Sequence, residues 1–429
     1  MVAAVLFSTL FGALLVTAPI AISLILACAL VFFVFYPNSP MVNLLTQSMV
    51  TTIDSFPLMA VPFFMLVGIL MEKTGLAKRL INVGEAIAGT SPGGLGAATI
   101  IACMFFAAIS GSGPAVVAAI GAIMIPAMGQ RGYDKDYAGA LVAAAATTGP
   151  VIPPSIPMII YGATVGVSVI KLFTGGFLPG ILMGGGLLAV NYYISKKRGY
   201  VGVPRQGGFK WVFAQIWEAK WALIMPGIVL GGIYAGFFTP TEAAIVGCIY
   251  AIFVGKFVYK DLTLPKFKDS LVEAALLSAI VMILLGGATT FGRLLTLERI
   301  PEQLSAWMLS ITQTPIIIML MINFALLISG MFIDTISNVV LFSPLFVPIV
   351  MKAGYDPVYF GVIMTVNLCI GFLTPPLGMN LFVAQGVAKV PFENIVKEVL
   401  PHLAVLIIAL ALMLFFPQIV TWLPEVLGL

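Results

Sequence analysis

The chain has 429 residues, of which 61% are hydrophobic and only 9% are charged, with a net charge of +4. Water-soluble domains carry about 25% charged residues, so this composition excludes an ordinary globular enzyme. Apolar runs recur along the whole chain, and about 20 such residues span a bilayer. The short alternating segments of a β-barrel are absent. The sequence therefore predicts an all-α polytopic membrane protein that is surrounded by membrane lipid and is not an enzyme.

A shift of 222 positions superposes the glycines and prolines of one half of the chain on those of the other without gaps. Pro126 meets Pro348, Gly149 meets Gly371, and residues 153–154 meet residues 375–376 as paired prolines. These residue types fix turns and breaks, so their coincidence means more than a match of apolar residues. We predict a first repeat at 1–200, a linker at 201–220 and a second repeat at 221–429.

In the first half, a hairpin is expected between two basic loops. By the positive-inside rule both loops are cytoplasmic, and they contain Lys73, Lys78, Arg79, Arg131 and Lys135. The stretch 92–128 between them is too long for one span and returns to the same side. We therefore predict a re-entrant hairpin over 92–128 that turns at 110–114, followed by a helix over 136–165 that is broken at 147–155.

The linker carries the strongest cluster of positive charge, which places residues 196–220 in the cytoplasm of a bacterial inner-membrane protein. Its basic residues are Lys196, Lys197, Arg198, Arg205, Lys210 and Lys220. A helical pair is expected next, at 222–237 and 242–259. Glu242 follows Pro240, where a carboxylate in the first turn of a helix is expected on electrostatic grounds alone.

In the second half, the loops that correspond to the basic loops of the first half hold only Arg299 and Lys352 as basic residues. These loops are therefore expected outside, which makes the second repeat inverted with respect to the first. The stretch 314–350 is then a hairpin entering from the opposite face, with its turn at 330–335. The helix that follows, over 359–384, is broken at 371–380.

The four breaks point to a transport site, because discontinuous helices at corresponding positions of two repeats typically line one. Proline and glycine free backbone carbonyls from the helical hydrogen-bond ladder, and a hard cation such as Na⁺ takes oxygen ligands. The helix N-termini that restart after each break favour an anion. The alternative is that these are merely proline-kinked helices packed through small residues.

Two charged residues are further candidates. Asp334, at the second hairpin tip, could face a cation or could only cap the restarting helix. Arg293, near the end of an apolar span, could hold a substrate carboxylate or could be an ordinary flanking anchor.

Three segments carry a resemblance to a known family: the Ser-Gly-Ser-Gly-Pro tip and the two breaks Gly-Pro-Val-Ile-Pro-Pro-Ser and Gly-Phe-Leu-Thr-Pro-Pro-Leu-Gly. The chain resembles, over essentially its whole length, the large membrane subunit of tripartite ATP-independent periplasmic (TRAP) transporters of the DctM type. The resemblance implies Na⁺-driven import of an organic acid, such as sialic acid or a C4-dicarboxylate, by an elevator mechanism. It also implies a periplasmic substrate-binding protein and a small four-helix membrane subunit. Because the chain has no additional N-terminal four-helix domain, that subunit is expected to be separate.

The resemblance also implies site residues. Two or more Na⁺ ions are expected. The first site is expected to use Ser110, Gly111, Ser112, Gly113, Gly149, Ile152 and Pro153, and the second Gly330, Asp334, Thr335, Gly371 and Thr374. The expected substrate contacts are Arg293, Ser112, Pro114, Ser155 and Asn380.

Three alternatives remain at this stage. A Na⁺/anion symporter that needs no binding protein would show the same breaks. An intramembrane enzyme would need a catalytic pair that the chain does not offer, and a channel would not need paired hairpins. No nucleic-acid partner is expected.

Overall fold

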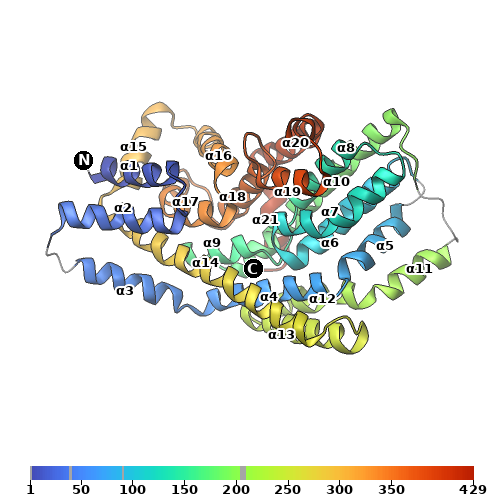
Figure 1. Ribbon diagram of the computed structural model, residues 1–429. Helices are drawn as coiled ribbons and strands as arrows, with labels where there is room; N and C mark the ends of the chain where they lie inside the picture. The colour runs from blue at the N-terminus through green and yellow to red at the C-terminus, as the bar shows by residue number, and fades with distance from the viewer. Residues whose placement is uncertain (1, 38–40, 89–90, 203–208) are drawn as a thin grey trace.

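The computed structural model describes residues 2–37, 41–88, 91–202 and 209–429, and the regular structure in these ranges is helical (Figure 1). Within them, eight helices are long and apolar enough to cross a membrane, or nine if the bent pair Lys210–Glu218 and Lys220–Tyr234 is one span. The prediction of an all-helical polytopic membrane protein is confirmed. Residues 203–208 of the predicted linker, Arg205 among them, lie outside the described ranges. The rest of the linker includes a helix, α11 (Phe209–Glu218), that the sequence did not suggest.

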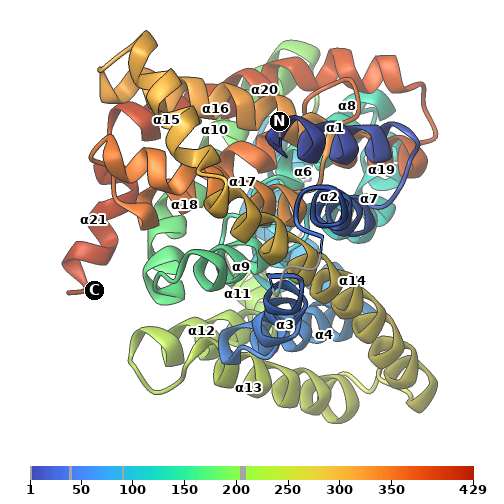
Figure 2. The same cartoon turned by 90° about the vertical axis from the view of Figure 1, so that its left-hand side faces the viewer.

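One layer of the protein, which we call the scaffold, is built around α14. In Figure 2 its helices α3, α4, α12 and α13 lie together at the lower edge, and α14 runs obliquely from the lower right toward the middle of the molecule. Both α3 and α4 pack against α14, and α4 also packs against α13. The described elements of the layer are α1 (Val2–Leu15), α2 (Ile20–Phe35), α3 (Met41–Ile53), the 3₁₀ helix η1 (Phe56–Met59), α4 (Ala60–Lys73), α12 (Lys220–Tyr234), α13 (Pro240–Phe253), the π-helix η2 (Val254–Val258) and α14 (Leu264–Leu297).

Local sequence explains how two scaffold helices begin. The Thr239 hydroxyl accepts the Glu242 N–H at 3.3 Å, and the Glu242 carboxylate accepts the Thr239 N–H at 2.8 Å. This reciprocal cap starts α13, so Glu242 has the helix-capping place that the sequence suggested. Thr263 caps α14 in a similar way. With 34 residues, α14 is about 51 Å long, well beyond a hydrocarbon core of about 30 Å, so it must cross a membrane tilted.

The second layer, which we call the hairpin layer, contains two copies of one arrangement. The arms α7 and α17 begin at Gly113 and Thr335 and end at Gln130 and Lys352, so both bounds differ by 222 residues. The first copy comprises α6 (Gly94–Ser110), α7 (Gly113–Gln130), α8 (Lys135–Ala146), α9 (Ile156–Val165) and α10 (Val169–Arg198). The second comprises α16 (Pro315–Phe332), α17 (Thr335–Lys352), α18 (Pro357–Gly371), α19 (Met379–Ala388), α20 (Phe392–Phe415) and α21 (Gln418–Val426).

The two copies interlock rather than lying side by side as separate units. The restarted helix of each copy packs against the other copy: α19 lies on α7 and α8, and α9 lies on α17 and α18. Equivalent glycines make these contacts close, because a Cβ at Gly139 would lie 3.3 Å from that of Ala388, and one at Gly361 would overlap the Tyr161 ring. The Tyr161 hydroxyl also donates to the Pro357 carbonyl at 2.6 Å. Each broken helix is thus held partly by the opposite repeat.

Two further helices connect the layers. The helix α5 (Leu76–Ala88) packs on the first hairpin arm α6, and α15 (Ile300–Ile311) packs on α17 and α14. Each lies immediately before a hairpin in the chain. The hairpins therefore meet the scaffold at α4, α14 and these two connecting helices.

Candidate functional site

At the second break, backbone lies directly against backbone. The helix α18 ends at Gly371, and a Cβ placed there would lie 2.6 Å from the carbonyl carbon of Gly330 and 2.8 Å from its oxygen. No side chain fits at Gly371, which is why this position needs glycine, and a Cβ at Gly330 would lie 3.2 Å from the Gly371 Cα, a tight contact. The end of the hairpin arm α16 therefore sits on the break that follows it, and its carbonyl groups come close to those of the interrupted helix.

Two threonine hydroxyls lie in these same segments. Thr335 opens α17; it is 2% exposed, and its hydroxyl lies beside the Cys369 thiol, a weak hydrogen-bonding group, with no nitrogen or oxygen partner among the described residues. A buried hydroxyl without a partner costs roughly 1–3 kcal/mol. Thr374 lies within the break and donates to the Ile370 carbonyl at 2.8 Å, which leaves its oxygen lone pairs free to accept a cation. Carbonyl and hydroxyl oxygens are the ligand type that Na⁺ takes, so the residues present fit such an ion.

Asp334 caps the helix that restarts at the second tip. Its carboxylate accepts the Ser337 N–H at 3.0 Å and also accepts the Ser337 hydroxyl. Asn338 fixes the same turn, since its amide donates to the carbonyls of Ile333 and Asp334 at 2.8 and 3.1 Å and its oxygen accepts the Ser329 hydroxyl. Of the two roles that the sequence left open for Asp334, the capping role is therefore present.

At the first break, more of the side-chain hydroxyls form hydrogen bonds within the break itself. The hydroxyls of Thr147 and Thr148 donate to the carbonyls of Ala144 and Ala145 at 2.5 and 2.7 Å. Ser155 caps α9, accepting the Met158 N–H at 3.3 Å and donating to the Pro150 carbonyl. Ser155 was a predicted substrate contact; its hydroxyl is buried and caps α9, and its role with the substrate stays a prediction.

The remaining residues of the predicted first Na⁺ site lie in the tip and the break. Gly111 has a φ of +62°, which favours glycine at the turn of the hairpin. Gly149, Ile152 and Pro153 are buried in the break, with the Ile152 side chain packed where α10 has a glycine, Gly180. The side chain of Ser110 lies outside the described residues. The assignment of these residues to Na⁺ stays a prediction.

Asn380 crosses from the second repeat to the first tip. Its amide nitrogen donates to the Ala143 carbonyl at 3.2 Å, and its side-chain oxygen is buried with no hydrogen-bond partner among the described residues. A Cβ at Gly113 would lie 2.9 Å from that oxygen. Asn380 was a predicted substrate contact; in the structure its free oxygen faces the first hairpin tip, and its role with the substrate stays a prediction.

Both hairpin tips border a single cavity of about 320 Å³, which we call the tip cavity. Its walls come from both tips and both restarted helices on one side and from α4 and α14 of the scaffold on the other. Ser112 and Pro114, two of the predicted substrate contacts, line it, as do Asp334 and Thr335. Its scaffold wall includes Glu72 and Glu273, which the sequence analysis missed although both lie within apolar spans, where a charge is a signal of function.

Arg293 lies in a different cavity, of about 610 Å³, which we call the Arg293 cavity. Residues Ala288–Leu297 of α14 form one wall, and Thr52, Thr164 and Pro344 contribute the others. The structure therefore does not bring Arg293 together with the tip residues that were predicted to share its substrate.

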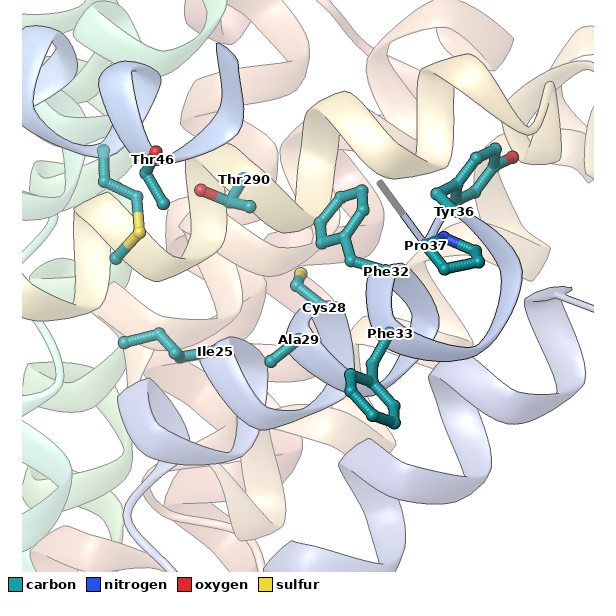
Figure 3. A pocket seen from close by; sticks show the side chains of 10 residues that line it. Ile25, Cys28, Ala29, Phe32, Phe33, Tyr36, Pro37, Thr46 and Thr290 are labelled. Carbon is teal, nitrogen blue, oxygen red and sulfur yellow. The ribbon is translucent and has the colours of Figure 1, made fainter. Parts of the chain in front are cut away.

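A third cavity, of about 310 Å³, lies between α2, α3 and α14 in the scaffold (Figure 3). Figure 3 shows its apolar lining, including Cys28 and Phe32 from α2, beside Thr290 of α14. None of the predicted site residues lines this cavity, so it is separate from the candidate transport site.

Nearly the whole chain matches a known protein family. Residues 7–419 match the family model of the tripartite ATP-independent periplasmic transporter DctM component. The chain is 48% identical over 97% of its length to the isethionate TRAP transporter permease protein DctMQ of Oleidesulfovibrio alaskensis, and it spans 65% of that protein's length. It is 40% identical to the sialic acid large permease protein SiaM of Vibrio cholerae and 39% identical to the C4-dicarboxylate large permease protein DctM of Pseudomonas aeruginosa. These two alignments cover 96% and 95% of both chains.

One solved structure shows the same fold. The YdaH transporter of Alcanivorax borkumensis matches 88% of each chain with a TM-score of 0.63, at 16% sequence identity. At this level of identity the likeness concerns the fold alone.

Proposed function

The chain belongs to the DctM component family of tripartite ATP-independent periplasmic transporters, and on this premise we propose that it imports a small organic anion in symport with Na⁺. It does so in the bacterial inner membrane, with residues 196–220 on the cytoplasmic side. A periplasmic binding protein delivers the anion, and a small four-helix membrane subunit completes the permease. The names of the relatives at 39–48% identity include isethionate, sialic acid and C4-dicarboxylate. The substrate class is therefore a small carboxylate or sulfonate.

The observation that carries the Na⁺ proposal is the buried Thr335 hydroxyl, which has no nitrogen or oxygen partner among the described residues, in the same segments as the close contact of Gly330 with Gly371. A Na⁺ ion at this place would take the hydroxyls of Thr335 and Thr374 and the carbonyls of the two glycines as ligands. The free oxygen of Asn380 at the first tip supports a second ion there, which gives one Na⁺ for each repeat.

The anion is proposed to bind in the tip cavity. The N-termini of α7 and α17 both open onto this cavity through Gly113 and Thr335. Helix N-termini favour negative charge, because their first N–H groups have no partner within the helix. Bound Na⁺ would add positive charge beside the same tips, so each ligand stabilises binding of the other.

Movement of the hairpin layer along the scaffold is the proposed transport step. The tip cavity lies between the two layers, so sliding the hairpin layer along α4 and α14 would carry the tips from one side of the membrane to the other. The interlocked packing of α9 and α19 between the two repeats favours motion of the layer as one body.

The test is uptake of labelled organic anions into proteoliposomes that contain the chain with its small subunit. The inward Na⁺ gradient and the loaded binding protein are varied independently, with isethionate, sialic acid and a C4-dicarboxylate compared. Uptake that requires both is the expected result. Uptake with Na⁺ alone would instead assign the chain to symporters that need no binding protein, and indifference to Na⁺ would overturn the ion sites.

A further inference from the structure

The tip cavity and the Arg293 cavity follow one another along α14. The tip cavity is lined by α14 residues between Glu273 and Leu284, and the Arg293 cavity by residues between Ala288 and Leu297. From the middle of one stretch to the middle of the other is about 20 Å at 1.5 Å per residue. Both cavities also border the hairpin layer, the second one through Thr164 of α9 and Pro344 of α17. Both cavities therefore lie on the surface of α14 along which the hairpin layer would slide.

The two cavities differ in the sign of their charge. The titratable residues that line the tip cavity are all acids: Glu72, Glu273 and Asp334. Glu273 is partly neutralised, since it pairs with Lys73 at 2.8 Å. In the Arg293 cavity the titratable lining residue is Arg293, which is exposed and forms no ion pair with any part of the chain that the structure describes.

The Arg293 cavity has the chemistry of an anion site. A guanidinium group binds carboxylate and sulfonate oxygens through paired N–H donors in a planar geometry. Four threonines, Thr52, Thr164, Thr289 and Thr296, share the lining. The last three donate their hydroxyl protons to carbonyls of their own helices, so each would have to rotate about its Cα–Cβ bond to donate to a bound oxyanion, and the guanidinium supplies the main N–H donors. An arginine that only anchors a helix end would face headgroups rather than a hydroxyl-lined cavity of about 610 Å³.

We propose that the Arg293 cavity is a receiving site for the transported anion on the periplasmic side, separate from the tip cavity. The inference rests on the proposed function for its direction, because the basic loops put the Leu264 end of α14 in the cytoplasm and its Leu297 end outside. The incoming carboxylate or sulfonate pairs with Arg293 there. Once Na⁺ has left the tip cavity, the acids there disfavour rebinding of the anion. The change from a positive to a negative cavity along α14 therefore favours release of the anion into the cytoplasm.

The test uses charge-selective labelling of a cysteine introduced into the cavity. Thr296→Cys is reconstituted with the small subunit, and its modification by an impermeant anionic sulfonatoethyl thiosulfonate is compared with that by the cationic trimethylammonium analogue. We expect Arg293 to speed the anionic reagent relative to the cationic one by roughly tenfold, and Arg293→Gln to abolish this preference. Transported anions should slow the labelling when Arg293 is present and not in the Arg293→Gln background.

Two controls make the result specific. Gln303 lies on α15 outside the cavity lining, so transported anions should not slow the labelling of Gln303→Cys. Lys352→Gln removes a charge from the same side of the membrane, by the predicted topology, and should leave the labelling preference at Thr296→Cys unchanged. An equal preference in the Arg293→Gln background, or protection that survives in it, would overturn the proposal.

A lipid phosphate could bind the same guanidinium, so the labelling is repeated in vesicles of phosphatidylcholine alone and with added phosphatidylglycerol. A substrate effect that is the same in both compositions supports the receiving site. An Arg293 effect that appears only with the anionic lipid assigns the cavity to a headgroup and overturns the proposal. Uptake measured on the same vesicles separates the receiving site from the proposed Na⁺ symport. Na⁺-independent uptake with intact substrate protection would contradict the symport and leave the receiving site standing.

Discussion

The two halves of the repeat share a backbone path but present different atoms at their tips and breaks. In the second half, Thr335 and Thr374 offer two hydroxyl oxygens at the tip and the break, and the equivalent positions 222 residues earlier are Gly113 and Ile152. Gly113 and Ile152 have no side-chain oxygen; the hydroxyls of the first half lie at other positions, such as Ser112 and Thr148, and the second half adds the oxygen of Asn380 at the first tip. The repeat thus determines the shape of both sites, whereas the ligand atoms differ from half to half.

The largest effect is expected where the second half brings backbone against backbone. In Gly371→Ala the new methyl group would overlap the Gly330 carbonyl, at a cost of roughly 1–3 kcal/mol or a displaced tip. We expect uptake to fall by roughly tenfold or more. The matched control is Gly386→Ala in α19, where an added Cβ meets nothing within 4 Å. Equal activity of the two variants would show that the close contact is dispensable.

The next effect isolates the hydroxyl of Thr335, whose equivalent in the first half is Gly113. Thr335→Val keeps the shape and removes the hydroxyl, so the Na⁺ concentration for half-maximal uptake should rise by roughly tenfold. Thr335→Ser should stay close to wild type. Because the only hydrogen-bonding group beside the hydroxyl among the described residues is the weak Cys369 thiol, loss of the hydroxyl should change the melting temperature little in Na⁺-free buffer. A lower melting temperature with unchanged Na⁺ dependence would assign Thr335 a purely structural role.

A smaller effect is expected from the oxygen that the first half receives from the second. Asn380→Leu removes the free oxygen and also the hydrogen bond to Ala143, and we expect the half-maximal Na⁺ concentration to rise by roughly threefold. Asn394→Leu, the same substitution outside both tips, serves as the control. If Asn380→Leu changed the anion affinity and left the Na⁺ dependence intact, Asn380 would return to the substrate contacts that the sequence suggested.

The smallest effect concerns an ion pair that joins the two halves of the hairpin layer. Arg198 at the end of α10 contacts Glu398 of α20 at 2.8 Å and Asp134 at 3.3 Å, with its side chain 35% exposed. Because partly exposed pairs contribute at most roughly 1 kcal/mol, Glu398→Gln should lower the melting temperature by only a few degrees, and less at high salt. Uptake should be nearly unchanged. A large loss of uptake would mean that the halves move relative to one another during transport.

Much of the architecture could be predicted from the sequence because glycine, proline and basic residues mark turns, breaks and sides. The 222-residue shift that aligned the paired prolines at 153–154 with those at 375–376 also relates the bounds of α7 to those of α17. The predicted tips at 110–114 and 330–335 include the two short gaps between the hairpin arms, at 111–112 and 333–334. These features depend on local backbone chemistry, which a single sequence records directly.

The placement of individual side chains could not be predicted in the same way, because it depends on how the two repeats pack together. The local sequence does not indicate that Asn380 faces Gly113 or that the Ser155 hydroxyl caps a helix. Arg293 and the tips are likewise assigned to different cavities by the long, continuous path of α14. Glu273 could have been identified, since a carboxylate inside an apolar span is costly unless it has a function or a partner.

The central claim is that each repeat holds one Na⁺, and binding of radiolabelled Na⁺ to the purified permease tests it most directly. Wild type is compared with Thr335→Val, Asn380→Leu and the double variant at a fixed Na⁺ concentration. We predict that each single variant loses part of the bound Na⁺ and that the double variant loses more than either. Sodium binding that is unchanged in all three variants would contradict the claim.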